Sequence, residues 1–389
     1  RRRGYVDARI ASRACAALER LRWAARPFFL AVGFVRPHLP WSVPEWAWAQ
    51  HDGTEFKLPL PLPPTDTSEL SLQSLGRWGE LRSYSGAPVH GRLTGAKALR
   101  HMQGYYAAVT FADNQLGRVL GAIDVTALSN RTVVVVTSDH GWKLGEFGAW
   151  SKHTTFEPDV HVPLFVRHPA APAEAQGART DAIVELIDIF PTVAQLAGLA
   201  PPASQLDGIS FAPLLTAPNH RGGDAAALFA PGRYALSQWP LNTHLPGGPD
   251  VFPCMAYRVR TVTHAAVRWY AANASVERAV RCSDSVDVFA LGEAGERERA
   301  NVADGAEGSH VLAQLAPVFA EHARWAPPPN GAPEPLKRHY QLWISDGDED
   351  GREQTRVALD CDKRRCVVAQ RTEDLVAEGE RGDPNADAA

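Results

Sequence analysis

No apolar stretch of this 389-residue sequence approaches the roughly 20 consecutive apolar residues that a membrane-spanning helix needs. Neither sign of charge dominates, because 40 Lys and Arg stand against 44 Asp and Glu and leave a net charge of −4. Non-specific binding to nucleic acid or to an anionic membrane needs a strongly basic surface, so we expect no nucleic-acid partner. The sequence also gives no sign of a transmembrane segment.

The composition is typical of a packed globular protein, with 45% hydrophobic and 22% charged residues. Buried strands alternate with helices over residues 1–215, which predicts an α/β layered domain with a mainly parallel central sheet. Residues 216–316 carry two adjacent strand patterns and predict a smaller C-terminal antiparallel subdomain. Residues 317–389 contain a Pro-rich linker and an acidic run, which predict a flexible tail.

The most informative segment begins at Val133–Val136, a β-branched run that is too short for a buried helix and typical of a central strand. Asp139, His140 and Gly141 follow, and the glycine is expected to permit a sharp turn. Ligands of open α/β sheets bind at the carboxyl ends of strands, which is where Asp139 and His140 fall. Taken alone, the three residues are more typical of a strand-ending turn with a solvated histidine than of a binding site.

Three segments in the correct order carry a wider resemblance. The first is P-F-F-L-A-V-G-F-V-R-P-H-L-P at 27–40. The second runs from S-D-H-G-W at 138–142 through Lys152 to H-V-P-L at 161–164. The third is E-L-I-D-I-F-P-T at 185–192, which is followed by L-A-G at 196–198. Together they resemble the sulfatase family, of the alkaline-phosphatase-like fold, in its iduronate-2-sulfatase-like branch. The resemblance spans roughly residues 5 to 215.

One departure from the family limits what the resemblance implies. Sulfatases use a formylglycine made from the first residue of C/S-x-P/A-x-R, preceded by two metal-binding aspartates on the first strand. None of the five cysteines stands in such a segment. We therefore expect that this chain lacks the nucleophile segment and half of the metal ligands, and that it does not turn over substrate alone.

The resemblance implies a metal site at the end of the strand. Asp139 would be an oxygen ligand to one divalent cation, Ca²⁺ by family. His140 occupies a position where many sulfatases carry Asn or Gln. Because calcium prefers oxygen ligands, His140 is expected either to ligate the cation or to hydrogen-bond the nucleophile or the sulfate.

The resemblance also implies three substrate contacts. Lys152 would place a positive charge on the sulfate oxygens, a role that suits a compact ammonium group. His38, held between Pro37 and Pro40, would contact the sulfate or protonate the leaving alkoxide. Trp142 would line a sugar-binding mouth. Without the resemblance, Lys152 and His38 would be interpreted as a solvated loop lysine and a surface turn histidine.

The predicted activity is hydrolysis of the sulfate ester of a sulfated sugar or glycosaminoglycan-type substrate by formylglycine chemistry. A phosphoesterase of the same superfamily, and a non-catalytic protein that binds a sulfated glycan or a partner, remain open as alternatives. Neither the sugar nor the oligomeric state can be read from the sequence.

The location of the protein is inferred mainly from the family resemblance, which implies a secretory, lysosomal-type or extracellular location. No signal peptide is visible in this sequence. Asn130 and Asn273 begin glycosylation sequons. Cys254 and Cys282 flank two predicted strands and can pair across them, and Cys361 and Cys366 can close a small loop, which leaves Cys15 as a buried thiol.

Overall fold

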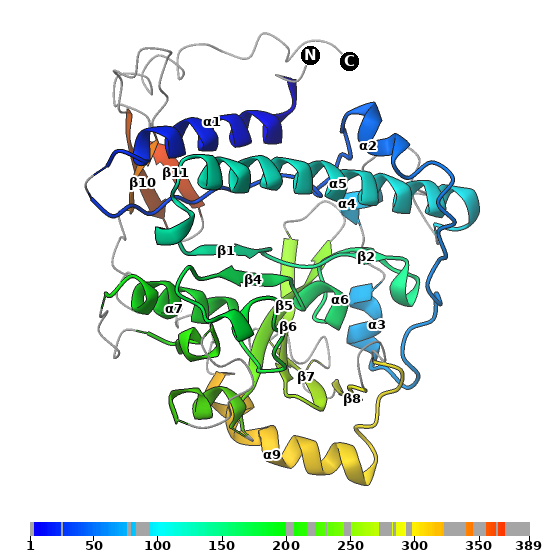
Figure 1. Cartoon of the computed structure of the whole chain (residues 1–389). Coiled ribbons are helices and arrows are strands. Elements are labelled where there is room, and N and C mark those ends of the chain that lie inside the picture. The colour runs from blue at the N-terminus through cyan, green and yellow to red at the C-terminus, as the bar shows by residue number, and fades with distance from the viewer. Residues whose placement is uncertain are drawn as a thin grey trace. The chain divides into compact units, whose positions relative to one another are not determined.

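The computed structural model describes residues 4–24, 26–75, 79–82, 93–199, 206–215, 223–230, 232–244, 250–271, 282, 285–292, 298–322, 340–344, 355–362 and 365–369 (Figure 1). The chain divides into two compact units, 1–325 and 326–389. The α-helices of the first unit are α1 (Val6–Leu21), α2 (Glu45–Ala49), α3 (Glu69–Leu75), α4 (Gly79–Arg82), α5 (Gly95–Val125), α6 (Glu157–Val160), α7 (Ile189–Leu196) and α9 (Ala306–His322). Its strands are β1 (Val134–Thr137), β2 (Lys143–Leu144), β3 (Trp150–Ser151), β4 (Leu164–Arg167), β5 (Ala235–His244), β6 (Asp250–Arg260), β7 (His264–Ala271) and β8 (Val286–Ala290). Mixed helix and sheet confirm the predicted α/β class.

Helices α1 and α5 form the layer above β1, and Figure 1 shows α1 lying along α5. The apolar spacing of 99–123 predicts one buried seam on this helix, and Met102, Val119 and Ile123 are buried as that spacing predicts. The spacing also places Asp113 on the seam, but Asp113 is exposed. Close packing requires a glycine at position 104, because a Cβ there would lie 2.6 Å from the Trp41 ring and 2.9 Å from the Trp48 ring.

The predicted parallel sheet is wrong for the strands that the structure describes, because every ladder among them is antiparallel. Strand β1 pairs with β4 in antiparallel register, Val135 opposite Val166. The chain between them, 138–163, makes a local excursion through β2, β3 and α6 and contains no crossover helix of the length that a parallel connection requires. The apolar runs 28–34 and 182–186 are also typical of buried strands, but they belong to no ladder among the described residues.

Residues 28–34 nevertheless keep the alternation of a half-covered strand. Phe28, Leu30, Val32 and Phe34 pack into the α1/α5 core beside Val134, whereas the residues between them are exposed. The apolar pattern therefore identified the side that faces the core, although this segment has no strand partner among the described residues.

The C-terminal part of the first unit is a four-stranded antiparallel sheet in the order β5-β6-β7-β8, as the sequence predicted for its central pair. One side of this sheet packs against α9 through residues such as Val259 and Phe319. The other side packs against α3 and the chain around 147–156 through Trp269 and Phe289. We call this second side the inner side of the sheet. Cys254 of β6 forms a disulfide with Cys282, which confirms the predicted pairing.

Three further observations complete the fold. Cys15 is a free, partly buried thiol. In the second unit, β9 (Tyr340–Ile344), β10 (Thr355–Asp362) and β11 (Arg365–Ala369) form an antiparallel sheet; the side chains of Cys361 and Cys366 lie outside the described residues. Of the helices that the structure describes, none combines the length and apolar character of a membrane span.

Candidate functional site

The end of β1 presents Asp139 and His140 side by side. Asp139 is 85% exposed, and its Oδ2 lies 3.6 Å from Nε2 of His140. The Nδ1 atom of His140 lies 2.9 Å from the Gly141 carbonyl oxygen, which can only accept a hydrogen bond. Nδ1 is therefore the donor, and Nε2 is the ring nitrogen that faces the aspartate. Nε2 and the carboxylate are the two groups at this position that can ligate a cation.

This pair is incomplete as a calcium site. Ca²⁺ takes six to eight ligands, nearly all oxygen, and the pair offers one carboxylate and one imidazole. Within the described part of the chain, no cluster of three or more His, Cys, Asp or Glu side chains is arranged to hold a metal ion. Asp139 and His140 thus fit a cation that receives most of its ligands from elsewhere.

Gly141 has a different role from the predicted turn, since its φ is not positive. A Cβ at this position would lie 2.0 Å from the Pro158 carbonyl oxygen. The Gly141 amide donates to the Asp159 carbonyl at 2.7 Å, so the backbone after His140 packs directly on the backbone that begins α6. Glycine is required here for close approach.

Lys152 lies in a strained loop. Phe147, Ser151 and His153 have φ values of +58°, +68° and +85°, a left-handed conformation that non-glycine residues rarely adopt. Such residues concentrate at functional sites, where the surrounding structure holds them. His153 is held by stacking on Trp239 of β5, with ring centroids 5.0 Å apart. The loop therefore fixes the direction of Lys152.

His38 and Lys152 meet at one carboxylate, that of Glu80 on α4. Nε2 of His38 lies 2.8 Å from Oε1 of Glu80, and Nζ of Lys152 lies 3.1 Å from Oε1 and 2.9 Å from Oε2. The lysine side chain is 12% exposed and the glutamate 20%. The structure thus brings together two of the predicted site residues, from segments more than a hundred positions apart.

Both ring nitrogens of His38 have an oxygen neighbour. Nδ1 lies 2.7 Å from the Leu39 carbonyl oxygen, which can only accept a hydrogen bond, so this nitrogen donates. Nε2 faces the Glu80 carboxylate at 2.8 Å. These two contacts fix the orientation of the ring, with Nε2 directed toward Glu80.

Trp142 completes this group. Its ring lies 5.2 Å from Nζ of Lys152, a cation–π contact, and it stacks on Tyr105 with centroids 6.0 Å apart. Burial, assisted by the charge of Glu146, raises the pKa of Tyr105 to about 12, so this residue stays a neutral phenol. Trp142 thus lies beside Lys152, and its role at a sugar-binding mouth stays a prediction.

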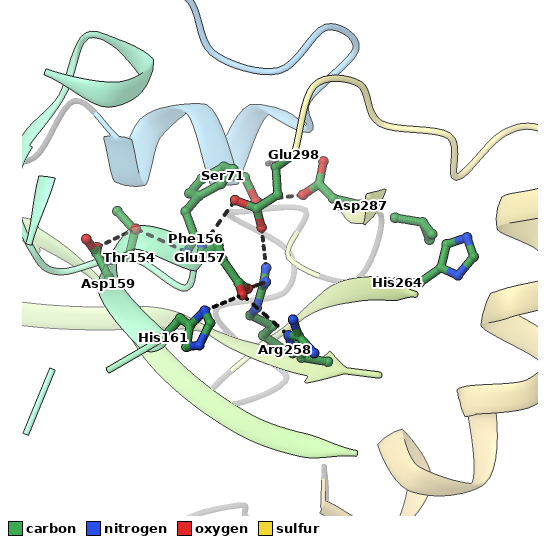
Figure 2. A network of polar contacts seen from close by, with 12 residues as sticks. Ser71, Thr154, Phe156, Glu157, Asp159, His161, Arg258, His264, Asp287 and Glu298 are labelled. Carbon is green, nitrogen blue, oxygen red and sulfur yellow. Dashed lines mark hydrogen bonds and ion pairs between the residues drawn. The ribbon is translucent and has the colours of Figure 1, made fainter. Parts of the chain in front are cut away.

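Arg258 on the inner side of the C-terminal sheet anchors the chain that follows Lys152 (Figure 2). Its guanidinium pairs with Glu298 and, at 2.5 Å, with Glu157, and all three side chains are buried. Burial alone would raise the pKa of Glu157, but the hydrogen bond from His161 and the charges of Arg258 and Arg260 outweigh it and lower that pKa to about 2. Burial raises the pKa of Glu298.

A second anchor, Asp287 of β8, holds the beginning of α3. Its carboxylate accepts hydrogen bonds from the Ser68 amide and hydroxyl, both at 2.7 Å, from Ser71 Oγ at 2.6 Å and from Asn301 at 3.0 Å. Burial raises the pKa of Asp287 although these donors lower it. Figure 2 shows Asp287 beside Ser71, close to the Arg258 cluster. Since α3 precedes α4, this contact helps to place Glu80.

Lys143 is a buried cation that the sequence analysis missed. Its ammonium pairs with Asp159 and lies 3.3 Å from Thr154 Oγ1. Burial lowers the pKa of Lys143, although Asp159 opposes the shift. The Asp159 carboxylate also accepts from the Thr154 amide at 2.9 Å, so this cluster ties β2 to the loop after Lys152. Its role is structural.

The predicted site residues thus fall into two groups. Lys152, His38 and Trp142 lie around Glu80, whereas Asp139 and His140 form a separate pair, and no hydrogen bond or ion pair joins the two groups in the described part of the chain. Glu80 was missed because it lies in an irregular region without a recognisable pattern. Asn130 is exposed beside β1, as a glycan acceptor must be; Asn273 lies outside the described residues.

Comparisons with known proteins show which family the chain resembles. A family model described as Sulfatase matches residues 2–199. Iduronate 2-sulfatase of Homo sapiens is 28% identical over 311 residues, covering 66% of this chain and 54% of that protein. Iduronate 2-sulfatase of Mus musculus is 32% identical over 220 residues, covering 48% and 38%. The chain spans about half the length, or less, of these curated relatives.

Solved structures share the fold. A phosphonate monoester hydrolase from Silicibacter pomeroyi superposes with a TM-score of 0.63 at 23% identity, over 84% of this chain and 61% of that one. A protein described as bound to its substrate, D-glucosamine-2-N,6-O-disulfate, superposes with a TM-score of 0.58 at 20% identity, over 85% and 72%. These similarities show the fold alone, and it is the alkaline-phosphatase-like fold that the sequence predicted.

Proposed function

This chain belongs to the sulfatase family, and from that membership we propose that it serves the hydrolysis of sulfate esters by holding the sulfate group between Lys152 and His38. The observation that carries the proposal is the convergence of these two side chains on one carboxylate. Lys152 and His38 hold the Glu80 carboxylate at distances of 2.8–3.1 Å. The same hydrogen-bond donors can hold the oxygens of a sulfate group.

The two side chains suit different parts of the reaction. Hydrolysis of a sulfate ester leaves negative charge on the departing oxygen, and a site gains rate by stabilising that charge. Lys152, with a flexible ammonium, can follow the sulfate oxygens. His38, whose Nε2 is directed toward the same position, can act as the general acid that protonates the leaving alkoxide.

For the metal we propose that Asp139 and His140 bind one divalent cation, Ca²⁺ being the ion that the family resemblance implies. The exposed aspartate oxygen and Nε2 of His140 support the assignment. A cation there would supply positive charge for the nucleophile and the sulfate. Because the described residues provide only two ligands, we assign no step of the reaction to it.

For the substrate we propose a sulfated sugar of the glycosaminoglycan type, which the two curated relatives named iduronate 2-sulfatase support. The Trp142 ring beside Lys152 supplies an apolar surface for a sugar. A formylglycine nucleophile remains the family expectation. The Cys254–Cys282 disulfide and the exposed Asn130 support an oxidising, secretory or lysosomal-type location.

Calorimetric titration of this chain with inorganic sulfate tests the sulfate-binding role. We expect Lys152→Ala to weaken sulfate binding at least tenfold, whereas Lys97→Ala, which removes an exposed lysine of α5, leaves it unchanged. Equal affinities of wild type and Lys152→Ala would show that the sulfate site lies elsewhere.

A further inference from the structure

We propose that Glu80 is an internal anion that occupies the sulfate position between His38 and Lys152, and that a sulfate ester must displace it in order to bind. This inference rests on the proposed function, because it takes these two residues as the sulfate-binding pair. In this proposal, Glu80 determines how tightly the site binds an anion.

The geometry shows that one carboxylate engages the donors that a sulfate would use. Oε1 of Glu80 lies 2.8 Å from His38 Nε2 and 3.1 Å from Lys152 Nζ, and Oε2 lies 2.9 Å from the same Nζ. Two anions cannot share these donors, since like charges at such distances repel strongly. The Glu80 carboxylate and a bound sulfate therefore exclude each other.

The site is sheltered enough for this competition to matter. Lys152 is 12% exposed and Glu80 20%, so water screens their attraction less than it screens a surface ion pair. Removal of the glutamate charge would leave Lys152 and His38 without this anionic partner, and an incoming sulfate would gain the interactions that the carboxylate had made. We expect Glu80 to lower the affinity for sulfate substantially.

Rotation of the Glu80 side chain is a route for this displacement. Leu81, the next residue on α4, is fully buried in a cluster with Leu39, Leu93 and Trp150, which holds the backbone of the helix in place. The three rotatable bonds of Glu80 then allow the carboxylate to leave while α4 stays packed.

The test is calorimetric titration of the full 389-residue chain with inorganic sulfate. Glu80→Gln keeps the shape and removes the charge, and we expect it to bind sulfate at least tenfold more tightly than wild type. Glu69→Gln is the matched control, because it removes an exposed carboxylate from the neighbouring helix α3, and we expect no change. Lys152→Ala in the Glu80→Gln background should abolish the gain.

Each outcome decides a different claim. A gain in sulfate affinity for Glu80→Gln that depends on Lys152 supports the proposal, because a purely structural role would not tighten binding. Unchanged or weaker binding by Glu80→Gln, with Lys152→Ala still weakening the wild type, overturns the role of Glu80 and leaves the sulfate site intact. A sulfate affinity that does not change on Lys152→Ala in any background overturns the proposed function and this inference together.

If Glu80→Gln does not fold, Glu80→Asp is the second variant, because it retains the charge on a shorter side chain. We expect it to bind sulfate more tightly than wild type, by a smaller factor than Glu80→Gln. A sulfate affinity of Glu80→Asp no tighter than that of wild type would then overturn the role of Glu80.

Discussion

Nζ of Lys152 lies 2.9 Å from Oε2 of Glu80, although the two residues are 72 positions apart in the chain. The contact depends on two supports that come from the C-terminal sheet. Stacking of His153 on Trp239 holds the loop that carries the lysine, and Asp287 holds the helix that precedes Glu80. The smaller sheet thus organises the candidate site without contributing a predicted catalytic side chain.

Arg258 is the first support that can be tested by mutation. Arg258→Ala would leave Glu157 and Glu298 buried without their shared cation, and the loss of one partner of a buried ion pair typically costs about 3–5 kcal/mol. Urea unfolding measures this loss. Arg260→Ala is the control, because Arg260 is more exposed and contacts Glu157 only at 3.4 Å; we expect a loss of about 1 kcal/mol or less. Equal effects of both variants would contradict the anchoring role of Arg258.

Glu157 should make stability depend on acid pH. Its pKa is about 2 in the folded chain and 4.5 in the reference state, so the unfolded chain binds more protons between these values and the carboxylate stabilises the fold above pH 4.5. That stabilisation disappears as pH falls from 4.5 toward 2, and it amounts to roughly 3 kcal/mol from the difference in pKa.

The measurement for Glu157 is the free energy of unfolding of wild type and Glu157→Gln across that range. We expect a constant advantage of wild type above pH 5 or so and a shrinking advantage below pH 4.5. A difference that did not change with pH would mean that Glu157 carries no depressed pKa.

Gly141 offers a steric prediction with an internal control. A Cβ at this position would lie 2.0 Å from the Pro158 carbonyl oxygen, so Gly141→Ala should force the backbone after His140 to move. Overpacking of this kind typically costs about 1–3 kcal/mol. We therefore expect Gly141→Ala to lower the Tm by several degrees. Gly117 lies within α5 with nothing inside 4 Å of its Cβ position. Gly117→Ala should therefore raise stability by up to about 1 kcal/mol.

The disulfide gives a prediction on the C-terminal sheet. Reduction of Cys254–Cys282, or Cys254→Ser, removes a link that closes a 28-residue separation, and we expect a loss of roughly 2–4 kcal/mol in the free energy of unfolding. Cys15→Ser, which changes a free thiol, should have little effect. Mass spectrometry under non-reducing conditions identifies the bond directly, and a free thiol at Cys254 would contradict it.

Local sequence pattern predicted the structure correctly where it agrees with the packing. The β-branched run at 133–136 predicted β1, and the antiparallel pair β6 and β7 was found as expected. Lys152 and His38 could be nominated because their motifs are distinctive, and they do converge.

The failures share a physical cause, which is dependence on distant partners. The segments 28–34 and 182–186 have strand-like sequences but belong to no ladder among the described residues. The glycine at position 104 of α5 is required by Trp41 and Trp48, which lie far away in the sequence. Glu80, Arg258 and Asp287 carry no local signal, because a buried charge is recognisable only once its partner is known.

Hydrolysis of a sulfate ester by the protein isolated from its own host tests the central claim most directly. The assay compares matched aryl sulfate and aryl phosphate esters, for wild type and Lys152→Ala. We predict that wild type prefers the sulfate ester and that Lys152→Ala lowers kcat/KM for it by two or more orders of magnitude, whereas Lys97→Ala does not. Unchanged kcat/KM in Lys152→Ala, or a preference for the phosphate ester, would contradict this account.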